Sequence, residues 1–330
     1  MKLGVLQFFS WPERRVDLAT VYARALERIG IMDRTGYDAV WLAEHHFSSF
    51  SVCPSVHMVG TLAAARTKRL RIGTAVSLAP FYHPLRLAEE VALLDVLSGG
   101  RVNWGAGRGF ARVEFTAFGV PPEESASRFH ETVEIVLRAW TDERLNFTGR
   151  HFRFEDVEVL PKPAQLPHPP VWMAASSEGA IDWAAGRGFS ILMDPHSSGP
   201  EIGAKRCYYA EKLKAAGFSE AGRDIPIARL VAIADNARKA MDVARNGAEW
   251  ILNSYLGAQH QPVIQGSFTP AGVNPVERYL DEVILHGTAD KVGDEILRLR
   301  EEIGLDYLLC APLSHQSFIL LTEKVLPRLM

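Results

Sequence analysis

Asp38-Ala-Val-Trp-Leu-Ala-Glu-His-His-Phe47 is the stretch that decides the fold of this chain. Its apolar residues 39–43 predict a short buried strand, and Glu44, His45 and His46 follow without a break. Charged groups are costly in a core unless they are paired or put to use. In α/β folds, ligands bind where the carboxyl ends of parallel strands open. The stretch therefore predicts a strand whose C-terminal end lies in an active site.

Strands and helices alternate on both sides of this stretch. Hydrophobic periodicity predicts strands at residues 3–9, 39–43, 70–78, 102–107, 171–175, 189–193, 225–234 and 307–310. It predicts helices at residues 16–34, 54–66, 84–97, 129–140, 177–187, 202–216, 236–256 and 291–303, and a last one from residue 316. Eight βα units in 330 residues predict an α/β fold, a TIM (β/α)8 barrel with insertions, as a single domain over residues 1–330. A doubly wound sheet gives a similar alternation with fewer strands.

Two segments interrupt the alternation. Residues 144–170 form an excursion, in which 147–160 alternate like a hairpin and 161–170 contain five prolines. Residues 257–286 are a candidate lid loop, because their first half is rich in Gly, Pro and Gln and has few apolar anchors. We expect this loop to close over the site and exclude water.

The composition restricts the class of protein. A hydrophobic content of 47% and a charged content of 23% are ordinary for a soluble globular enzyme. The net charge of −3 argues against a nucleic-acid or anionic-lipid partner. The chain has three separate cysteines, no signal-peptide pattern at its start, and no apolar run near the ~18 residues of a membrane span. These features predict a cytoplasmic protein with no membrane segment.

Two features resemble phosphate-binding elements. Residues 105–110, Gly-Ala-Gly-Arg-Gly-Phe, place Arg108 among glycines, and Ser176 and Ser177 immediately precede a predicted helix with its free N–H groups. Two other interpretations stay open, a plain N-cap for Ser177 and a surface arginine for Arg108. The glycines do not form a Rossmann fingerprint, because their spacing is G-x-G-x-G, they belong to a fourth strand, and no acidic partner follows in a strand about 20 residues later.

The adjacent histidines invite a metal-site interpretation, which the pattern does not favour. Neighbouring strand residues point to opposite faces, so only one of His45 and His46 can enter the barrel mouth. Other histidines, His57, His83 and His130, lie in or before predicted helices. We therefore expect no metal, and a mouth histidine suited to proton transfer or hydrogen bonding.

Further motifs occur in a fixed order along the chain. They are EHHF at residues 44–47, RIGTAV at 71–76, HPLR at 83–86, LDVLSGGRV at 94–102, GRG at 107–109, FG at 118–119, SRF at 127–129, VWMAASS at 171–177, WAA at 183–185 and GTAD at 287–290. In this order and spacing they resemble the bacterial luciferase-like flavin-dependent monooxygenase family over nearly the whole chain. The fold of that family is a TIM barrel with an excursion before the fifth strand.

The resemblance implies catalytic roles at the end of the second strand. His45 matches the family's catalytic histidine, which stabilises the flavin 4a-hydroperoxide or moves a proton in its breakdown. Glu44 matches a carboxylate beneath the flavin. Ala75 and Val76 match the position of a non-proline cis peptide against the flavin ring.

The resemblance also implies a cofactor cradle. Arg108, Arg128 and Ser177 match the binding site for the FMN phosphate, and we include Ser176 beside them. The light-emitting luciferase subunit has a cysteine where Gly107 stands and an acid where Ser176 stands. These differences argue against bioluminescence and leave the substrate open.

The implied chemistry needs a partner, because the sequence shows no nicotinamide- or FAD-binding Rossmann domain. Reduced FMN is expected as a diffusible co-substrate, supplied by a separate NAD(P)H:flavin reductase, and O2 then oxygenates a small organic substrate. The family suggests a homodimer. Alternatives are a deazaflavin-dependent hydride-transfer enzyme, a non-catalytic flavin-binding subunit, and a metal-dependent barrel hydrolase. Retention of His45, Arg108 and Arg128 argues against the non-catalytic subunit.

Overall fold

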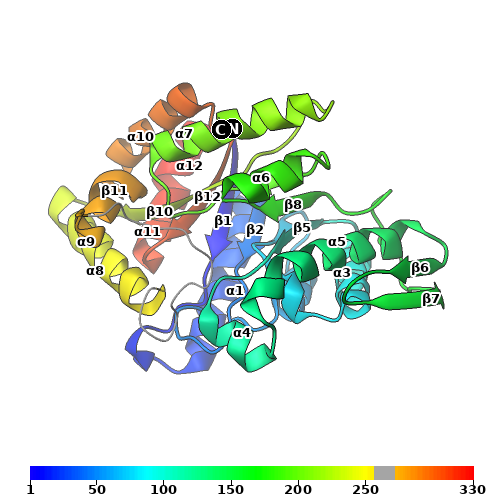
Figure 1. The fold of residues 1–330 in the computed structure, drawn as a ribbon. Coiled ribbons are helices and arrows are strands. Elements are labelled where there is room, and N and C mark those ends of the chain that lie inside the picture. The colour runs from blue at the N-terminus through cyan, green and yellow to red at the C-terminus, as the bar shows by residue number, and fades with distance from the viewer. Residues whose placement is uncertain (256–271) are drawn as a thin grey trace.

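Eight parallel strands form a ring in the computed structural model, which describes residues 1–255 and 272–330 (Figure 1). They are β1 (Lys2–Gln7), β2 (Ala39–Leu42), β3 (Arg71–Thr74), β5 (Val102–Gly107), β8 (Val171–Ala174), β9 (Ser190–Leu192), β10 (Ile227–Ile233) and β12 (Tyr307–Pro312). Each pairs with the next, and β12 pairs with β1. Met193 joins β9 to β10 through hydrogen bonds of 3.0 Å to Pro226 and 3.2 Å from Ala228. The predicted barrel and its eight strands are confirmed.

Two short strands extend the ring. The predicted strand 70–78 is divided, because β3 ends at Thr74 and β4 (Ser77–Leu78) pairs with the far end of β5. A strand that periodicity missed, β11 (Ile284–Gly287), pairs with the end of β10. It has only four residues, too few for a clear alternation.

Helices cover the outside of the ring (Figure 1). They are α1 (Leu18–Thr35), α2 (Val56–Arg66), α3 (Pro84–Ser98), α4 (Arg112–Phe118), α5 (Ser125–Thr141), α6 (Glu178–Ala185), α7 (Gly199–Ala215), α8 (Ala237–Tyr255), α9 (Pro275–Arg278), α10 (Ala289–Ile303), α11 (His315–Leu320) and α12 (Leu326–Leu329). Local signals set their ends: Asp17 caps the start of α1 through Thr20 N–H, and Gly36 ends it in the left-handed conformation. Among the described residues, no helix is both long and apolar enough to cross a bilayer.

The barrel interior has an aromatic floor beneath the site. Trp41 of β2 is fully buried, donates a hydrogen bond of 3.0 Å to the Tyr307 hydroxyl, and meets Trp172 edge-on at 5.2 Å between ring centroids. Because these large side chains fill the ring, the barrel is a packed core and only the strand ends are left for ligands.

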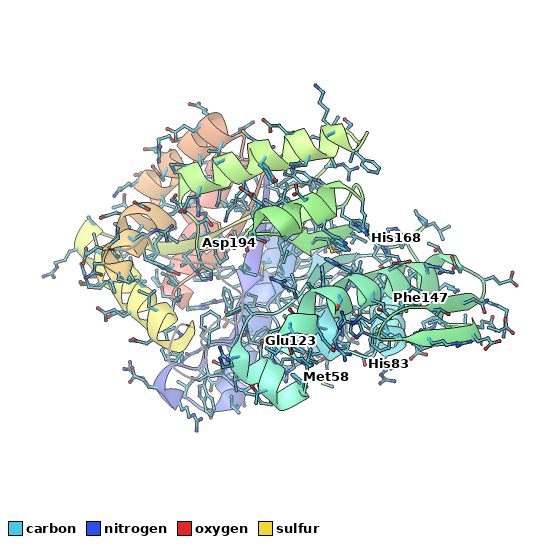
Figure 2. All side chains as sticks on the ribbon, in the orientation of Figure 1. Met58, His83, Glu123, Phe147, His168 and Asp194 are labelled. Atoms are coloured by element: carbon cyan, nitrogen blue, oxygen red, sulfur yellow. The ribbon has the colours of Figure 1, made fainter. Side chains whose placement is uncertain are left out.

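The predicted excursion is present as a hairpin, β6 (Leu145–Thr148) with antiparallel β7 (Arg153–Val157), which projects to one side of the barrel (Figure 1). Phe147 and His83, labelled in Figure 2, lie in this region. The turn is held by Glu131, whose carboxylate accepts hydrogen bonds from the backbone N–H groups of residues 150–152.

The candidate lid loop needs a correction. Its last part, from residue 272, is not a loop: it forms α9, a π-helical turn (Tyr279–Val283) and β11, and Tyr279 and Leu280 are buried. Apolar residues at 276, 279, 280 and 283 have helical spacing, which the Gly/Pro-rich composition upstream concealed. Residues 257–271 of the predicted lid lie outside the described residues, and its closure stays a prediction.

Candidate active site

Glu44 is buried directly after β2, with 2% of the residue exposed. Its Oε2 accepts hydrogen bonds from the Tyr82 hydroxyl at 2.9 Å and from Leu78 N–H at 3.4 Å, and its Oε1 lies 3.0 Å from His46 Nε2. Burial and then the Glu44 charge raise the pKa of Cys53 to about 12 and raise the pKa of Tyr82. Both carboxylate oxygens are engaged by these contacts, which hold the Glu44 side chain in place after β2.

His45 projects into an aromatic pocket at the barrel mouth. Its ring lies 5.1 Å from Phe50 and 6.2 Å from Phe110, both edge-on, and 6.3 Å from Phe8 in a stacked arrangement. Its Nδ1 is 3.8 Å from Glu114 Oε1. An imidazole with apolar walls and a carboxylate at one nitrogen is suited to holding and moving a proton.

Glu114 is a site residue that the sequence did not indicate, because the short helix α4 that carries it was not predicted. It is 1% exposed, and its Oε1 accepts a hydrogen bond of 3.0 Å from His46 N–H. Its Oε2 is buried without a hydrogen-bond partner among the described residues. A signal was present in Val113-Glu-Phe115, a single acid between apolar residues. Within the same residues, no group of three His, Cys, Asp or Glu side chains is placed to hold a metal ion.

The peptide bond between Ala75 and Val76 is cis, as the family resemblance implied. Both residues are half-buried between β3 and β4. Val76 Cγ2 packs directly on Gly107, where a Cβ would overlap it. Gly105 is equally restricted, since Thr74 Oγ1 accepts from its N–H at 2.9 Å and donates to its carbonyl at 2.7 Å. These two glycines therefore belong to the packing of β5 and not to a flexible phosphate loop, which corrects that interpretation.

Arg108 is half-buried just beyond β5, and burial lowers its pKa. In the described part of the chain its guanidinium makes no hydrogen bond or ion pair. It lies close enough to His130 to act on it: the pKa of His130 falls to about 4 because of burial, then Arg187, then Arg108. The His130 ring stacks on Trp183 of α6 at 4.3 Å, and Arg187 lies 4.7 Å above the same indole. Arg108 and Arg187, for which residues 1–255 and 272–330 provide no ion-pair partner, therefore form a cationic region next to α6.

The start of α6 is open. Ser176 and Ser177 are exposed, and although Ser177 occupies the N-cap position, its hydroxyl makes no capping hydrogen bond. Arg128 of α5 is less available, because Glu124 Oε2 lies 2.9 Å from its Nε and 2.8 Å from a terminal nitrogen. The unpaired Arg108 and the uncapped helix start fit a phosphate group, which needs cationic and N–H donors.

A buried polar cluster lies on the other side of the mouth, after β9. Burial would raise the pKa of Asp194, labelled in Figure 2, but Lys205 at 3.3 Å and His196 outweigh it and lower that pKa. His196 accepts or donates a hydrogen bond of 2.9 Å with the Tyr279 hydroxyl. Burial, opposed by Asp194 and assisted by His45, Arg278 and Lys205, lowers the pKa of His196 to about 4. His196 therefore faces the site as a neutral imidazole, which the sequence did not reveal.

A cavity of about 780 Å³ lies next to two of the aromatic rings that surround His45. Phe8, Phe50 and His196 line it, and both phenylalanines contact the His45 ring. This volume is in the range of small-molecule sites.

The model of a family described as luciferase-like monooxygenase matches residues 1–307. The chain belongs to the luciferase-like monooxygenase family. The family resemblance noted in the sequence is therefore confirmed. An uncharacterized protein of Sinorhizobium fredii, y4wF, is 33% identical over 89% of this chain and 85% of its own length. The oxygenase component of a flavin-dependent trigonelline monooxygenase from Acinetobacter baylyi is 31% identical over 55% of this chain and 51% of its own.

Several solved structures superpose well on this chain. The monooxygenase RslO1 from Streptomyces bottropensis has a TM-score of 0.87 and 28% identity, with 100% of both chains covered. The oxygenating constituent of 3,6-diketocamphane monooxygenase from Pseudomonas putida, in complex with FMN, has a TM-score of 0.80 and 21% identity over 99% of this chain and 98% of its own. An F420-dependent secondary alcohol dehydrogenase has a TM-score of 0.77 and 19% identity over 100% of this chain and 99% of its own. The last two similarities show the fold alone.

Proposed function

We propose that this luciferase-like protein is the oxygenase component of a flavin-dependent monooxygenase. It takes up reduced FMN from a separate NAD(P)H:flavin reductase and uses O2 to oxygenate a small organic substrate. The observation that carries the proposal is Arg108, a half-buried cation with no partner among the described residues, beside the uncapped start of α6. An unpaired buried cation is costly unless a ligand neutralises it, and a phosphate does so.

The chain's own residues supply binding and proton chemistry. Arg108, Ser177 and the first N–H groups of α6 hold the phosphate, and Ala75 and Val76 lie against the flavin ring. Reduced flavin, when bound, supplies the two electrons with which O2 delivers one oxygen atom to the substrate and one to water.

His45 holds a proton at the mouth, and the carboxylate of Glu114, 3.8 Å from its Nδ1, orients the imidazole. The aromatic rings around His45 exclude water from the reacting centre. Glu44 fixes His46 and Tyr82 beneath the site.

The relatives support this choice in part. The trigonelline enzyme is named an oxygenase component, which implies a reductase partner for that protein. The camphane enzyme was solved with FMN, whereas the alcohol dehydrogenase uses F420, so the fold accommodates both coenzymes. Phosphate binding at α6 therefore does not distinguish FMN from the deazaflavin coenzyme. The EHHF motif favours FMN. A deazaflavin hydride-transfer enzyme is the second candidate.

We further propose a homodimer in the cytoplasm, where NAD(P)H and the reductase are found. Apolar side chains on neighbouring α2 and α3 face solvent, with Met58 75% and Leu97 57% exposed (Met58 is labelled in Figure 2). Exposed apolar patches of this kind mark association surfaces.

The experiment is an anaerobic titration with reduced FMN, followed by admission of O2. Wild type, His45→Ala and the control His168→Ala, which changes a histidine at the opposite end of the barrel, are compared for flavin reoxidation and hydrogen peroxide release. Wild type and His168→Ala should reoxidise slowly with little peroxide, and His45→Ala rapidly with much.

Equal peroxide release by all three proteins would remove His45 from the mechanism. Absence of reduced FMN binding would reject the FMN proposal, and tight binding of reduced deazaflavin in its place would establish the second candidate.

A further inference from the structure

The cavity beside His45 has two chemically different parts. Near His45 its wall is aromatic, with Phe8 and Phe50, and it then extends between α1, α8 and the loop after β12. In that outer part the wall includes Arg24 and Arg28 of α1 and Trp250 of α8. A molecule that fills the cavity therefore has an apolar end near His45 and a polar end near α1.

Three buried polar atoms on this wall have no hydrogen-bond partner in residues 1–255 and 272–330: Arg28 Nε, Trp250 Nε1 and Gln7 Oε1. A buried donor or acceptor without a partner costs free energy comparable to a lost hydrogen bond. All three atoms are almost wholly enclosed by protein, so a ligand in the cavity meets Arg28 through the terminal nitrogens of its guanidinium, which make no hydrogen bond or ion pair among the described residues.

Arg28 is the stronger of the two donors. Its guanidinium lies 5.4 Å from the centre of the Phe318 ring, and burial, then Arg24, lowers its pKa to about 10 although the charge of Glu27 opposes them. Helical side chains point toward the N-terminus of their helix, which directs Arg28 toward the barrel mouth. Among the described residues, no carboxylate lies within ion-pair distance of it, and the remaining residues 256–271 contain no Asp or Glu.

The acidic residues of the cavity wall do not neutralise Arg28. Glu13 is paired with Arg15, and Glu249 is exposed to solvent. The polar end of the cavity thus presents the Arg28 guanidinium, a largely desolvated cation that suits an anion with oxygen acceptors.

We propose that this cavity is the substrate site and that it takes an organic carboxylate, whose anionic group binds Arg28. The apolar body lies along Phe8 and Phe50, so the end remote from the carboxylate reaches His45 and is the end that is oxygenated. The reaction part rests on the proposed function, whereas carboxylate binding does not.

The test uses isothermal titration calorimetry on the flavin-free protein with two matched pairs, octanoate with octanamide and phenylacetate with phenylacetamide. Charge-assisted hydrogen bonds predict that at least one acid binds about tenfold or more tightly than its amide, and that added salt reduces the difference. In Arg28→Gln the acid should lose that advantage while the amide changes by less than about twofold. Arg28→Lys should keep part of it, since an ammonium lacks the planar fork. Arg300→Gln, at an exposed arginine of α10, is the matched control.

Equal affinity of acids and amides in the wild type, or no binding of either, would overturn the proposal, as would an unchanged acid affinity in Arg28→Gln. The wild-type comparison and its salt dependence decide the question even if the variant does not fold. The assay contains no flavin. Acid binding combined with failure to bind reduced FMN would therefore reject the proposed function alone, and the converse result would reject the substrate class alone.

Discussion

Replacement of Arg108 by Gln tests the cofactor cradle most directly. The substitution removes a charge and keeps a long polar side chain at a position that makes no ion pair in the described part of the chain. Its own structural cost should therefore be small. If Arg108 binds the phosphate, the variant should bind reduced FMN less tightly but should bind reduced riboflavin, which lacks the phosphate, as before.

The magnitude follows from the kind of contact. Hydrogen bonds to charged groups contribute about 1.5–3 kcal/mol, which corresponds to roughly a 10- to 150-fold loss of FMN affinity. Arg128→Gln should reduce FMN affinity less, by roughly threefold or below. Glu124 already neutralises the Arg128 guanidinium at 2.8 Å, so a phosphate that binds Arg128 has to compete with this ion pair. Ser177→Ala, which removes a hydroxyl that caps nothing, should lie between the two.

Anaerobic calorimetry with reduced FMN and reduced riboflavin measures the ratio of the two affinities for each variant. A fall in riboflavin affinity equal to the fall in FMN affinity would show that Arg108 supports the structure and does not bind phosphate. A larger effect at Arg128 than at Arg108 would refute the reasoning from ion pairing.

Three further predictions concern stability and assembly. The pKa of His130 is about 4 in the folded protein and 6.5 in its ordinary state, so on acidification the unfolded chain binds the proton first. The contribution of His130 to the free energy of unfolding is therefore fully present above about pH 6.5 and is lost as the pH falls toward 4. Thermal melts of His130→Phe should show a weaker decline over that range, and parallel curves would contradict the assignment. Gly105→Ala should destabilise by about 3 kcal/mol or more, because the new Cβ overlaps a carbonyl oxygen of β3. The control Gly179→Ala, with open space around it, should stay within about 1 kcal/mol of wild type in denaturant titrations, and similar losses in both variants would contradict the packing argument. Met58→Glu combined with Leu97→Glu should convert a dimer to a monomer in light scattering, whereas Leu166→Glu, at another exposed leucine, should not. A monomeric wild type would reject the dimer.

Long periodic segments made the barrel predictable. The eight strands of the ring are buried and rich in apolar residues. Most of the intervening helices have capping residues at their ends or apolar residues at helical spacing, and both signals can be recognised in the sequence. The polar residues at strand ends were also predictable, because a charge directly after an apolar strand is a local conflict. Glu44 and His45 were singled out in this way, whereas Arg108 was singled out by its place among glycines after the fourth strand, and their roles stay predictions.

The residues that the sequence missed are those that reach the site from elsewhere. Glu114 lies on a seven-residue helix, too short for periodicity, and it meets His45 only because β2 and β5 converge in the barrel. His196 is four residues beyond β9 and becomes part of the site through Tyr279, which is distant in sequence. Arg28 resembles any exposed arginine of an amphipathic helix until the cavity beside it is known. Glu114, His196 and Arg28 belong to the site because the fold brings distant segments together, and no local sequence pattern indicates this.

The order of strands in the ring allows the two proposed anions, the flavin phosphate and the substrate carboxylate, to bind at one site. Arg108 follows β5, and Arg28 lies next to the loop after β12, and these strands are four positions apart in the eight-membered ring, on opposite sides of the mouth. His45, after β2, lies between them. A phosphate held at one side and a carboxylate at the other are each neutralised locally, and their mutual repulsion across the mouth is weakened by distance and by screening. The same separation directs the uncharged parts of both molecules toward the aromatic rings around His45, where the flavin and the oxidisable end of the substrate have to meet.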